Sequence, residues 1–185
     1  MTAGVTREEL REVLANADCL HDAAAIQDAV RRLAAAINPQ YRDRCPLVLV
    51  VMNGGLLPAG WLLPAFDFFF ELDYVHATRY RGRTSGDKLQ WLAKPHKSLQ
   101  GRDVLLVDDI LDEGVTLREL IAWCGEEGAN SVRTAVLVQK DIGRPASAKA
   151  DFVGLVVENR YVFGCGMDYK EHFRHLPALY ALGRK

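Results

Sequence analysis

Two patterns typical of surface helices occupy the N-terminal part of the chain. Thr6 followed by Glu9 fits a capping box and predicts a short polar helix that runs to about Ala17. A second helix is predicted from Asp22 until the Asn-Pro pair at 38–39, because proline disfavours helix for itself and for the residue before it. Its apolar stripe at helical spacing consists of Ile26, Ala29, Val30, Leu33 and Ile37.

From residue 47 onward, short apolar runs bounded by turn residues predict β-strands. LVLVVM (47–52) and DVLLVDDI (103–110) have the apolar character of central strands in a parallel sheet, which are buried on both faces. The other extended segments are SVRTAVLVQK (131–140), DFVGLVV (151–157) and YVFGCG (161–166).

Helical segments separate these strands and predict an α/β fold. A helix should begin at Leu56 and end or kink at Pro64, and TLRELIAWCGEEG (116–128) is predicted as a helix closed by Gly125 or Gly128. Strands that alternate with helices are typical of a parallel sheet. Between the two helices the pattern predicts an extended stretch (68–80), a mobile surface loop (81–88) and a return strand (89–93).

Composition and charge indicate a soluble globular protein with one domain, residues 1–185. Of the 185 residues, 49% are hydrophobic and 25% charged, which excludes a disordered tail, a collagen-like repeat and a coiled coil. There are 23 Lys and Arg against 24 Asp and Glu, so the net charge is −1. Because nucleic-acid binders present a basic surface, no nucleic-acid partner is expected.

The sequence favours the cytoplasm over a membrane or an oxidising compartment. The N-terminus MTAGVTREELRE is charged where a signal peptide needs an apolar core, and the most apolar stretch, LLPAGWLLPAFDFFF, is interrupted by two prolines and Asp67. The four cysteines, at positions 19, 45, 124 and 165, show no CxxC or Cys/His ligand spacing. We therefore expect a cytoplasmic protein with intact thiols, no zinc site and no membrane association.

Carboxylates and a glycine-bearing turn follow one apolar strand, at the sheet edge where α/β proteins bind ligands. After the apolar run 104–107 the chain reads Asp108, Asp109, Ile110, Leu111, Asp112, Glu113, Gly114, Val115 and Thr116, and a helix follows. The N–H groups at a helix start suit a phosphate near Gly114 and Thr116. Asp108 and Asp109 can accept hydrogen bonds from ribose hydroxyls or hold magnesium near a pyrophosphate. The combination suggests a ribose 5-phosphate; alternatively, Asp108 or Asp112 merely caps the helix.

The same stretch closely resembles the signature of the phosphoribosyltransferase family: an apolar strand, two acidic residues, two aliphatic residues, Asp, Thr, Gly, any residue and Thr. Here it stands as VLLVDDILDEGVTL (104–117), with Glu113 where the family usually has Thr. The resemblance implies that Asp108 and Asp109 fix the ribose and that Asp112 takes a proton from the attacking base. It also implies a phosphate site made of Glu113, Gly114, Val115 and Thr116.

Matches from about Leu47 to Leu176 narrow the resemblance to the hypoxanthine-guanine phosphoribosyltransferases. LVQK (137–140) is similar to the strand ending in the lysine that contacts the purine 6-oxo group, and residues 151–177 resemble the segment that covers the base and pyrophosphate. The implied roles are purine contact by Lys140, stacking by Tyr161, base binding by the carbonyl of Val162, magnesium binding by Asp168 and pyrophosphate contact by Arg174.

Each of these residues also has an ordinary explanation. Lys140 could be a solvated strand end, and Tyr161 could belong to the core. Asp168 could cap the segment that follows it, and Arg174 could pair with Glu171 on one helical face.

Two further segments resemble the family with departures. MNGG (52–55) resembles the pyrophosphate loop, which often contains a non-proline cis peptide, but Asn53 replaces the common lysine ahead of Gly54. One cation near pyrophosphate is therefore missing, and the contact passes to main-chain amides. ATRYRGRTSGDK (77–88) lies where the family has its mobile loop with a Ser-Tyr pair; Tyr80 is kept, whereas Arg79 replaces the serine and could compensate for the absent lysine charge.

The resemblance implies a 6-oxopurine phosphoribosyltransferase with a parallel-sheet α/β core and a small hood built from the terminal segments. It implies transfer of 5-phosphoribosyl from phosphoribosyl pyrophosphate to hypoxanthine, and to guanine too, giving IMP or GMP and pyrophosphate. Mg²⁺ would be held by Asp168, Asp108 and Asp109, and the protein would be a homodimer or homotetramer. Two rivals remain: a nucleotide-sensing regulator on the same fold, and a different α/β enzyme with metal-dependent phosphate chemistry.

Overall fold

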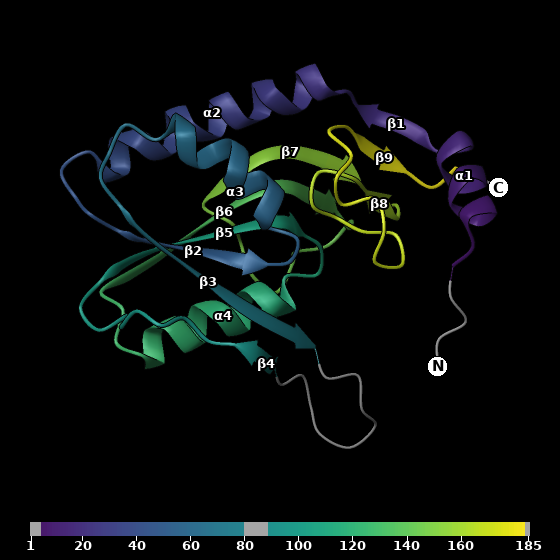
Figure 1. The fold of residues 1–185 in the computed structure, drawn as a ribbon. Coiled ribbons are helices and arrows are strands. Elements are labelled where there is room, and N and C mark those ends of the chain that lie inside the picture. The colour runs from purple at the N-terminus through teal and green to yellow at the C-terminus, as the bar shows by residue number, and fades with distance from the viewer. Residues whose placement is uncertain (1–4, 80–88, 184–185) are drawn as a thin grey trace.

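The computed structural model describes residues 5–79 and 89–183, and a six-stranded sheet runs through its centre (Figure 1). The strand order is β4-β3-β2-β5-β6-β7. Neighbouring strands are parallel except at one edge, where β4 is antiparallel to β3, so the predicted parallel α/β core is confirmed. The strands are β2 (Leu47–Met52), β3 (Glu71–Arg79), β4 (Leu89–Ala93), β5 (Asp103–Leu111), β6 (Ser131–Asp141) and β7 (Phe152–Glu158).

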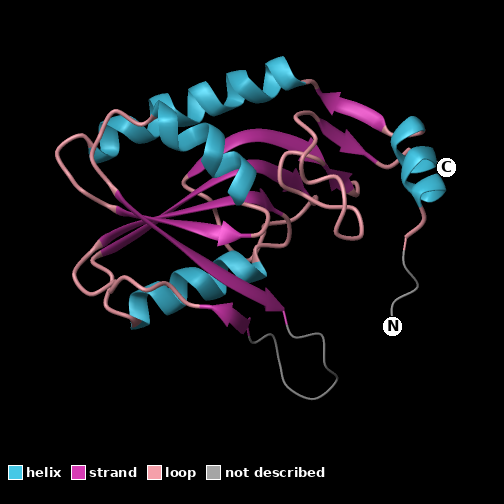
Figure 2. Ribbon diagram, in the orientation of Figure 1, coloured by secondary structure: helices cyan, strands magenta, loops and turns pink. Residues whose placement is uncertain are grey.

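Helices cover both faces of this sheet, α2 and α3 on one side and α4 on the other (Figure 2). Side chains alternate along a strand, so Val48 and Val50 belong to the core under α2 and α3, whereas Leu47 and Leu49 pack in the core under α4. Burial on both faces explains why β2 is apolar throughout. These helices are α2 (Ala23–Tyr41), α3 (Leu56–Leu62) with a following 3-10 turn (Leu63–Ala65), and α4 (Val115–Glu126).

The terminal segments form a small hood beside the carboxyl ends of the main strands (Figure 1). Its antiparallel three-stranded sheet has the order β1-β9-β8, so segments from the two ends of the chain pair with each other. The expected hood is confirmed, although β1 was not predicted, because its four partly exposed residues carry no clear alternation. The hood contains α1 (Arg7–Ala15), β1 (Asp18–His21), β8 (Val162–Phe163) and β9 (Leu179–Ala181).

Helix α2 does not end before Pro39, as the sequence predicts, but continues through it to Tyr41. A proline this close to a helix end removes one backbone hydrogen bond. The last turn is held by Tyr41, which is 1% exposed and packs against Phe68 with ring centroids 5.4 Å apart. Burial of a large side chain contributes about 1.5–3 kcal/mol, more than the ~0.5–1.5 kcal/mol of a single hydrogen bond.

Other helix ends differ from prediction by small amounts. α1 ends at Ala15, slightly earlier than expected. α4 runs past Gly125, and Gly128 closes it with a left-handed φ of +82°. None of the helices in the described ranges is long and apolar enough to cross a membrane.

Candidate functional site

Two carboxylates lie where strand β5 extends beyond its neighbour β2. β2 pairs with β5 only as far as Val50 opposite Val107, whereas β5 continues beside β6 to Leu111. Asp108 and Asp109 stand inside β5, as in the predicted strand 103–110, and the strand runs one residue further than predicted, to Leu111. Because β5 has no β2 residue beside it there, both side chains border a cavity at the carboxyl end of the sheet.

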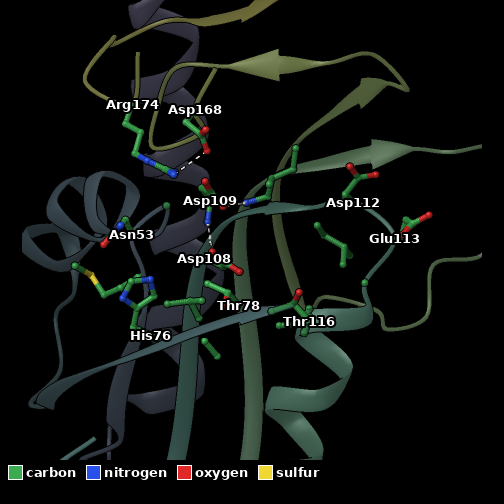
Figure 3. A pocket seen from close by; sticks show the side chains of 18 of the residues that line it. Asn53, His76, Thr78, Asp108, Asp109, Asp112, Glu113, Thr116, Asp168 and Arg174 are labelled. Carbon is green, nitrogen blue, oxygen red and sulfur yellow. Dashed lines mark hydrogen bonds and ion pairs between the residues drawn. The ribbon is translucent and has the colours of Figure 1, made fainter. Parts of the chain in front are cut away.

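This cavity has a volume of about 700 Å³ and is lined by the ends of β2, β3 and β5, the start of α4 and the segment between β8 and β9 (Figure 3). Its size falls within the roughly 300–1,000 Å³ range of ligand pockets. It brings together most of the predicted phosphate, ribose and metal residues: Asn53, Gly54, Asp108, Asp109, Asp112, Glu113, Gly114, Thr116, Asp168 and Arg174.

A smaller cavity of about 180 Å³ adjoins the first and contains the predicted purine residues. It shares Asp109, Asp112 and Asp168 with the larger cavity and adds Lys140, Tyr161 and Val162. Among the predicted residues that the structure describes, Val115 begins α4 without lining either cavity. Tyr80 lies outside the described residues, as does the predicted loop 81–88.

The adjacent carboxylates of Asp108 and Asp109 are electrostatically costly when both are charged. Burial raises the pKa of both side chains, and the neighbouring Asp109 charge raises the pKa of Asp108 further. Oδ1 of Asp108 accepts the N–H of Asp109 at 2.9 Å, and Oδ1 of Asp109 accepts the N–H of Ile110 at 2.7 Å. These bonds offset only part of the cost, so a ligand that brings hydroxyl donors or positive charge would relieve it.

The loop after β2 packs directly against Asp109. A Cβ at Gly54 would lie 2.1 Å from Oδ2 of Asp109, and a Cβ at Gly166 would lie 2.1 Å from the Gly54 carbonyl oxygen. Only glycine allows this approach at either position. The Met52–Asn53 peptide is cis, as the resemblance implies.

The turn into α4 faces the larger cavity and has no side-chain cap. Gly114 is the N-cap residue, with a left-handed φ of +79°, and a Cβ there would lie 2.7 Å from the main-chain nitrogen of Ala148. The alternative that Asp108 or Asp112 caps the helix is therefore wrong. Since the first turn of a helix directs its N–H groups outward along the axis, this turn can receive an anion.

Lys140 and Asp112 form an ion pair at the edge of the smaller cavity. Nζ of Lys140 donates to Oδ2 of Asp112 at 2.7 Å, and the lysine side chain is 12% exposed against 42% for the aspartate. The alternative of a solvated strand end is wrong for Lys140. Tyr161 is 48% exposed, so it is not a core residue, and its hydroxyl donates to the carbonyl of Asp168 at 3.1 Å.

Asp168 and Arg174 bind each other across the loop between β8 and β9. The Arg174 guanidinium lies 2.7 Å from Oδ1 of Asp168 and 3.2 Å from a Glu171 carboxylate oxygen, and it donates to the Gly166 carbonyl at 2.9 Å. Oδ2 of Asp168 accepts the N–H of Glu171 at 2.8 Å. Asp168 thus caps the segment locally and Arg174 pairs with Glu171, but residues 168–174 form no helix, so the predicted helical face is wrong. Asp168 and Arg174 also line the cavity.

The sequence analysis did not predict His76, Thr78 or Glu171 as site residues, although Thr78 lies in the segment 77–88 and Glu171 was considered as a partner of Arg174. All three line the larger cavity. His76 and Thr78 stand near the end of β3, whose residues pair in parallel with β2 so that Met52 lies opposite His76. The sequence shows only an extended stretch there. The available signal was that the carboxyl ends of neighbouring parallel strands meet at one edge of a sheet.

The oxygen ligands of the larger cavity fit magnesium bound together with a phosphate ligand. Among the residues that the structure describes, no group of three or more His, Cys, Asp or Glu side chains is arranged as a metal site. Mg²⁺ does not need one, because it usually binds through one or two carboxylates, waters and substrate phosphates. Asp108, Asp109 and Asp168 supply such carboxylates.

Comparisons with known proteins agree with this geometry. The phosphoribosyl transferase domain model matches residues 16–171. The chain is 35% identical over 153 residues to a hypoxanthine-guanine phosphoribosyltransferase of Bacillus subtilis, covering 82% of this chain and 85% of the relative. It is 34% identical over 180 residues to a hypoxanthine-guanine-xanthine phosphoribosyltransferase of Tritrichomonas foetus, covering 97% and 95%.

Solved structures show the same fold. A hypoxanthine-guanine-xanthine phosphoribosyltransferase superposes with a TM-score of 0.80 at 32% identity, over 90% of this chain and 97% of that one. A hypoxanthine phosphoribosyltransferase of Staphylococcus aureus superposes with a TM-score of 0.86, over 96% of both chains. At 24% identity, the second likeness supports the fold alone.

Proposed function

The chain belongs to the phosphoribosyltransferase family, and on this premise we propose that it transfers 5-phosphoribosyl from phosphoribosyl pyrophosphate to hypoxanthine and guanine, forming IMP or GMP and pyrophosphate. The observation that carries this proposal is the Lys140–Asp112 pair, which borders the small cavity close to the turn into α4. The relatives named above for these purines support the choice of substrate.

The pair matches one edge of a 6-oxopurine. O6 and N7 lie side by side on that edge, and in the proposed complex O6 accepts from Lys140 while N7–H donates to Asp112. Because Nζ and Oδ2 are 2.7 Å apart, a donor and an acceptor sit next to each other, as this edge requires. Tyr161 would stack on the ring, and the Val162 carbonyl would accept from the base.

The larger cavity suits the ribose phosphate. Asp108 and Asp109 would accept hydrogen bonds from the ribose hydroxyls, which relieves the cost of their burial. The 5-phosphate would lie on the turn into α4, formed by Glu113, Gly114, Val115 and Thr116.

Pyrophosphate would leave on the side of Asn53, Gly54 and Arg174. Asp168, Asp108 and Asp109 would hold Mg²⁺, which when bound neutralises negative charge that develops on the departing pyrophosphate. Arg174 is already bound to Asp168 and Glu171, so it would contact pyrophosphate with its remaining donors.

In the reaction, the bond from purine N9 to the anomeric carbon forms as the bond from that carbon to pyrophosphate breaks. The electron pair of the broken bond leaves with pyrophosphate, and the proton on N7 passes to Asp112. Lys140 stays on O6 and stabilises charge there. In this proposal Asp112 is the base, Lys140 contacts the purine and the turn into α4 binds the phosphate, all around one reacting carbon.

We also propose that the protein is a single-domain homodimer or homotetramer of the cytoplasm, with no nucleic-acid partner. Leu56, Leu72 and Tyr74 are 60%, 47% and 42% exposed and line an apolar cavity of about 410 Å³ beside α3, which supports self-association. The thiols of Cys19 and Cys45 are free and exposed, which is typical of a reducing compartment.

A spectrophotometric assay with phosphoribosyl pyrophosphate, Mg²⁺ and hypoxanthine tests the proposed function, with adenine as the matched control substrate. We expect IMP to form with hypoxanthine and at least about tenfold lower kcat/KM with adenine, whose 6-amino group cannot accept from Lys140. Tight binding of phosphoribosyl pyrophosphate without turnover would instead indicate a regulator. If the protein neither binds phosphoribosyl pyrophosphate nor turns it over, the proposed substrate is wrong.

A further inference from the structure

The described lining of the larger cavity has six carboxyl groups but one guanidinium, although the substrate proposed for it carries phosphates at both ends. Among its described lining residues, Arg174 is the one guanidinium or ammonium, and Asp168 and Glu171 already bind it. The loop after β2 supplies the uncharged Asn53. The carboxylates of the lining are Asp108, Asp109, Asp112, Glu113, Asp168 and Glu171.

His76 stands at the pyrophosphate side of this cavity. In β3 it lies opposite Met52, the residue before Asn53, and it is half-buried. Figure 3 shows His76 and Asn53 together on one side of the cavity, with Glu113 and Thr116 on the other. The imidazole is therefore near the predicted pyrophosphate and away from the predicted 5-phosphate.

We propose that His76 is a pyrophosphate-binding residue that supplies a further N–H donor beside Asn53 and, when protonated, the positive charge that the uncharged Asn53 does not provide. The proposal rests on the proposed function, which puts pyrophosphate on this side. Imidazole has one N–H to donate in its neutral form and two in its charged form, so His76 can bind a phosphate oxygen in either state. A single hydrogen bond to a charged group changes affinity by about tenfold or more.

Titration calorimetry with inorganic pyrophosphate and Mg²⁺ tests the proposal directly. His76→Leu keeps the bulk of the side chain but removes its donors, and we expect a Kd at least about tenfold weaker. His76→Gln retains a donor, so its affinity for pyrophosphate should fall less. His96→Leu is the matched control, since His96 is exposed on the segment after β4, and its Kd should equal that of the wild type.

A double substitution tests whether the two positions serve one ligand group. Asn53→Lys supplies an ammonium on the same side of the cavity, so we expect it to restore most of the affinity that His76→Leu removes while improving the wild type less. Equal gains in both backgrounds would contradict a shared role. Circular dichroism and thermal unfolding establish that each variant is folded. If His76→Leu is not folded, His76→Ala, which also removes the donors, replaces it in both measurements.

The two proposals fail in different ways. If the wild type makes IMP and binds pyrophosphate, but a folded variant without the donors, His76→Leu or His76→Ala, binds it with wild-type Kd, the assignment of His76 is wrong and the proposed function stands. If the wild type neither makes IMP nor binds pyrophosphate, the proposed function fails, and the role of His76 fails with it.

Discussion

Two regions of the site hold their functional groups by different means. The strand-end region (residues 52–54 and 108–116) is fixed by the parallel sheet and by close glycine contacts such as Gly54 on Asp109. The covering loop (residues 161–174) has little regular structure, and four of its non-glycine residues adopt positive φ. Main-chain bonds such as those between Tyr169 and His172, and the Arg174 ion pairs, hold it instead.

This difference suggests that the two regions have different functions. The sheet holds charged groups at fixed positions despite a cost in stability, as the raised pKa values of Asp108 and Asp109 show. The covering loop brings Tyr161 and Val162 to the smaller cavity, which is the proposed purine side. We therefore expect substitutions in the strand-end region to damage the chemical step, and substitutions on the purine side to change which base is used.

The largest effect is expected from Asp112→Asn, which removes the proposed proton acceptor while retaining the side-chain shape. General-base catalysis contributes about 100- to 10,000-fold, so kcat should fall by that factor with little change in the KM for phosphoribosyl pyrophosphate. Steady-state kinetics beside the control Asp43→Asn, at an exposed position, measure this. A variant with more than half of the wild-type kcat would exclude Asp112 as the base.

The second-largest loss of activity is expected from Gly54→Ala, because the added Cβ would lie 2.1 Å from Oδ2 of Asp109 and displace that carboxylate. A misplacement of about 1 Å costs roughly 100-fold in rate, so we expect a loss of that order in kcat/KM. Gly60→Ala is the matched control, since nothing lies within 4 Å of its added Cβ. Similar activity in the two variants would show that Asp109 does not need its present position.

The loss from Lys140→Gln should be smaller and selective. Glutamine can donate to O6 or accept from a 6-amino group, so kcat/KM for hypoxanthine should fall and the preference over adenine should shrink by about tenfold or more. Lys149→Gln, at an exposed position, is the control. An unchanged ratio of hypoxanthine to adenine would mean that Lys140 does not distinguish the bases.

The smallest expected effect is a gain in stability from Asp108→Asn. The pKa of Asp108 is raised in the folded protein, so its carboxylate destabilises the fold increasingly as pH rises above about 4, the pKa of an unfolded-chain aspartate. Asparagine can still accept the N–H of Asp109, and at pH 7 we expect a Tm higher by about 2–4 °C, which corresponds to ~1 kcal/mol in a domain of this size.

Calorimetry at pH 7 and near pH 4 checks both the gain and its sign, because the gain should disappear once Asp108 is protonated in the wild type. A Tm that falls at pH 7, or a gain that persists unchanged at low pH, would contradict the raised pKa. Asp43→Asn serves again as the exposed control.

The two regions also differ in how far the sequence predicts them. Residues 108–116 of the strand-end region are contiguous, so their order along the chain alone suggested a ribose phosphate, and β5 ends one residue after its predicted end. Residues 52–54 were identified by resemblance alone. The covering loop could be placed only by resemblance, since positive φ at residues such as Cys165 and Phe173 has no local sequence signal. His76 was missed because its position depends on the pairing of β3 with β2, which local periodicity does not specify.

The structure of the protein with IMP bound would show whether the two cavities hold the two halves of one nucleotide. We expect phosphate oxygens within about 3 Å of main-chain N–H groups at the turn into α4, and hypoxanthine O6 within about 3 Å of Nζ of Lys140 with the ring on Tyr161. A phosphate bound away from residues 113–116, or a purine outside the cavity of Lys140 and Tyr161, would contradict the account.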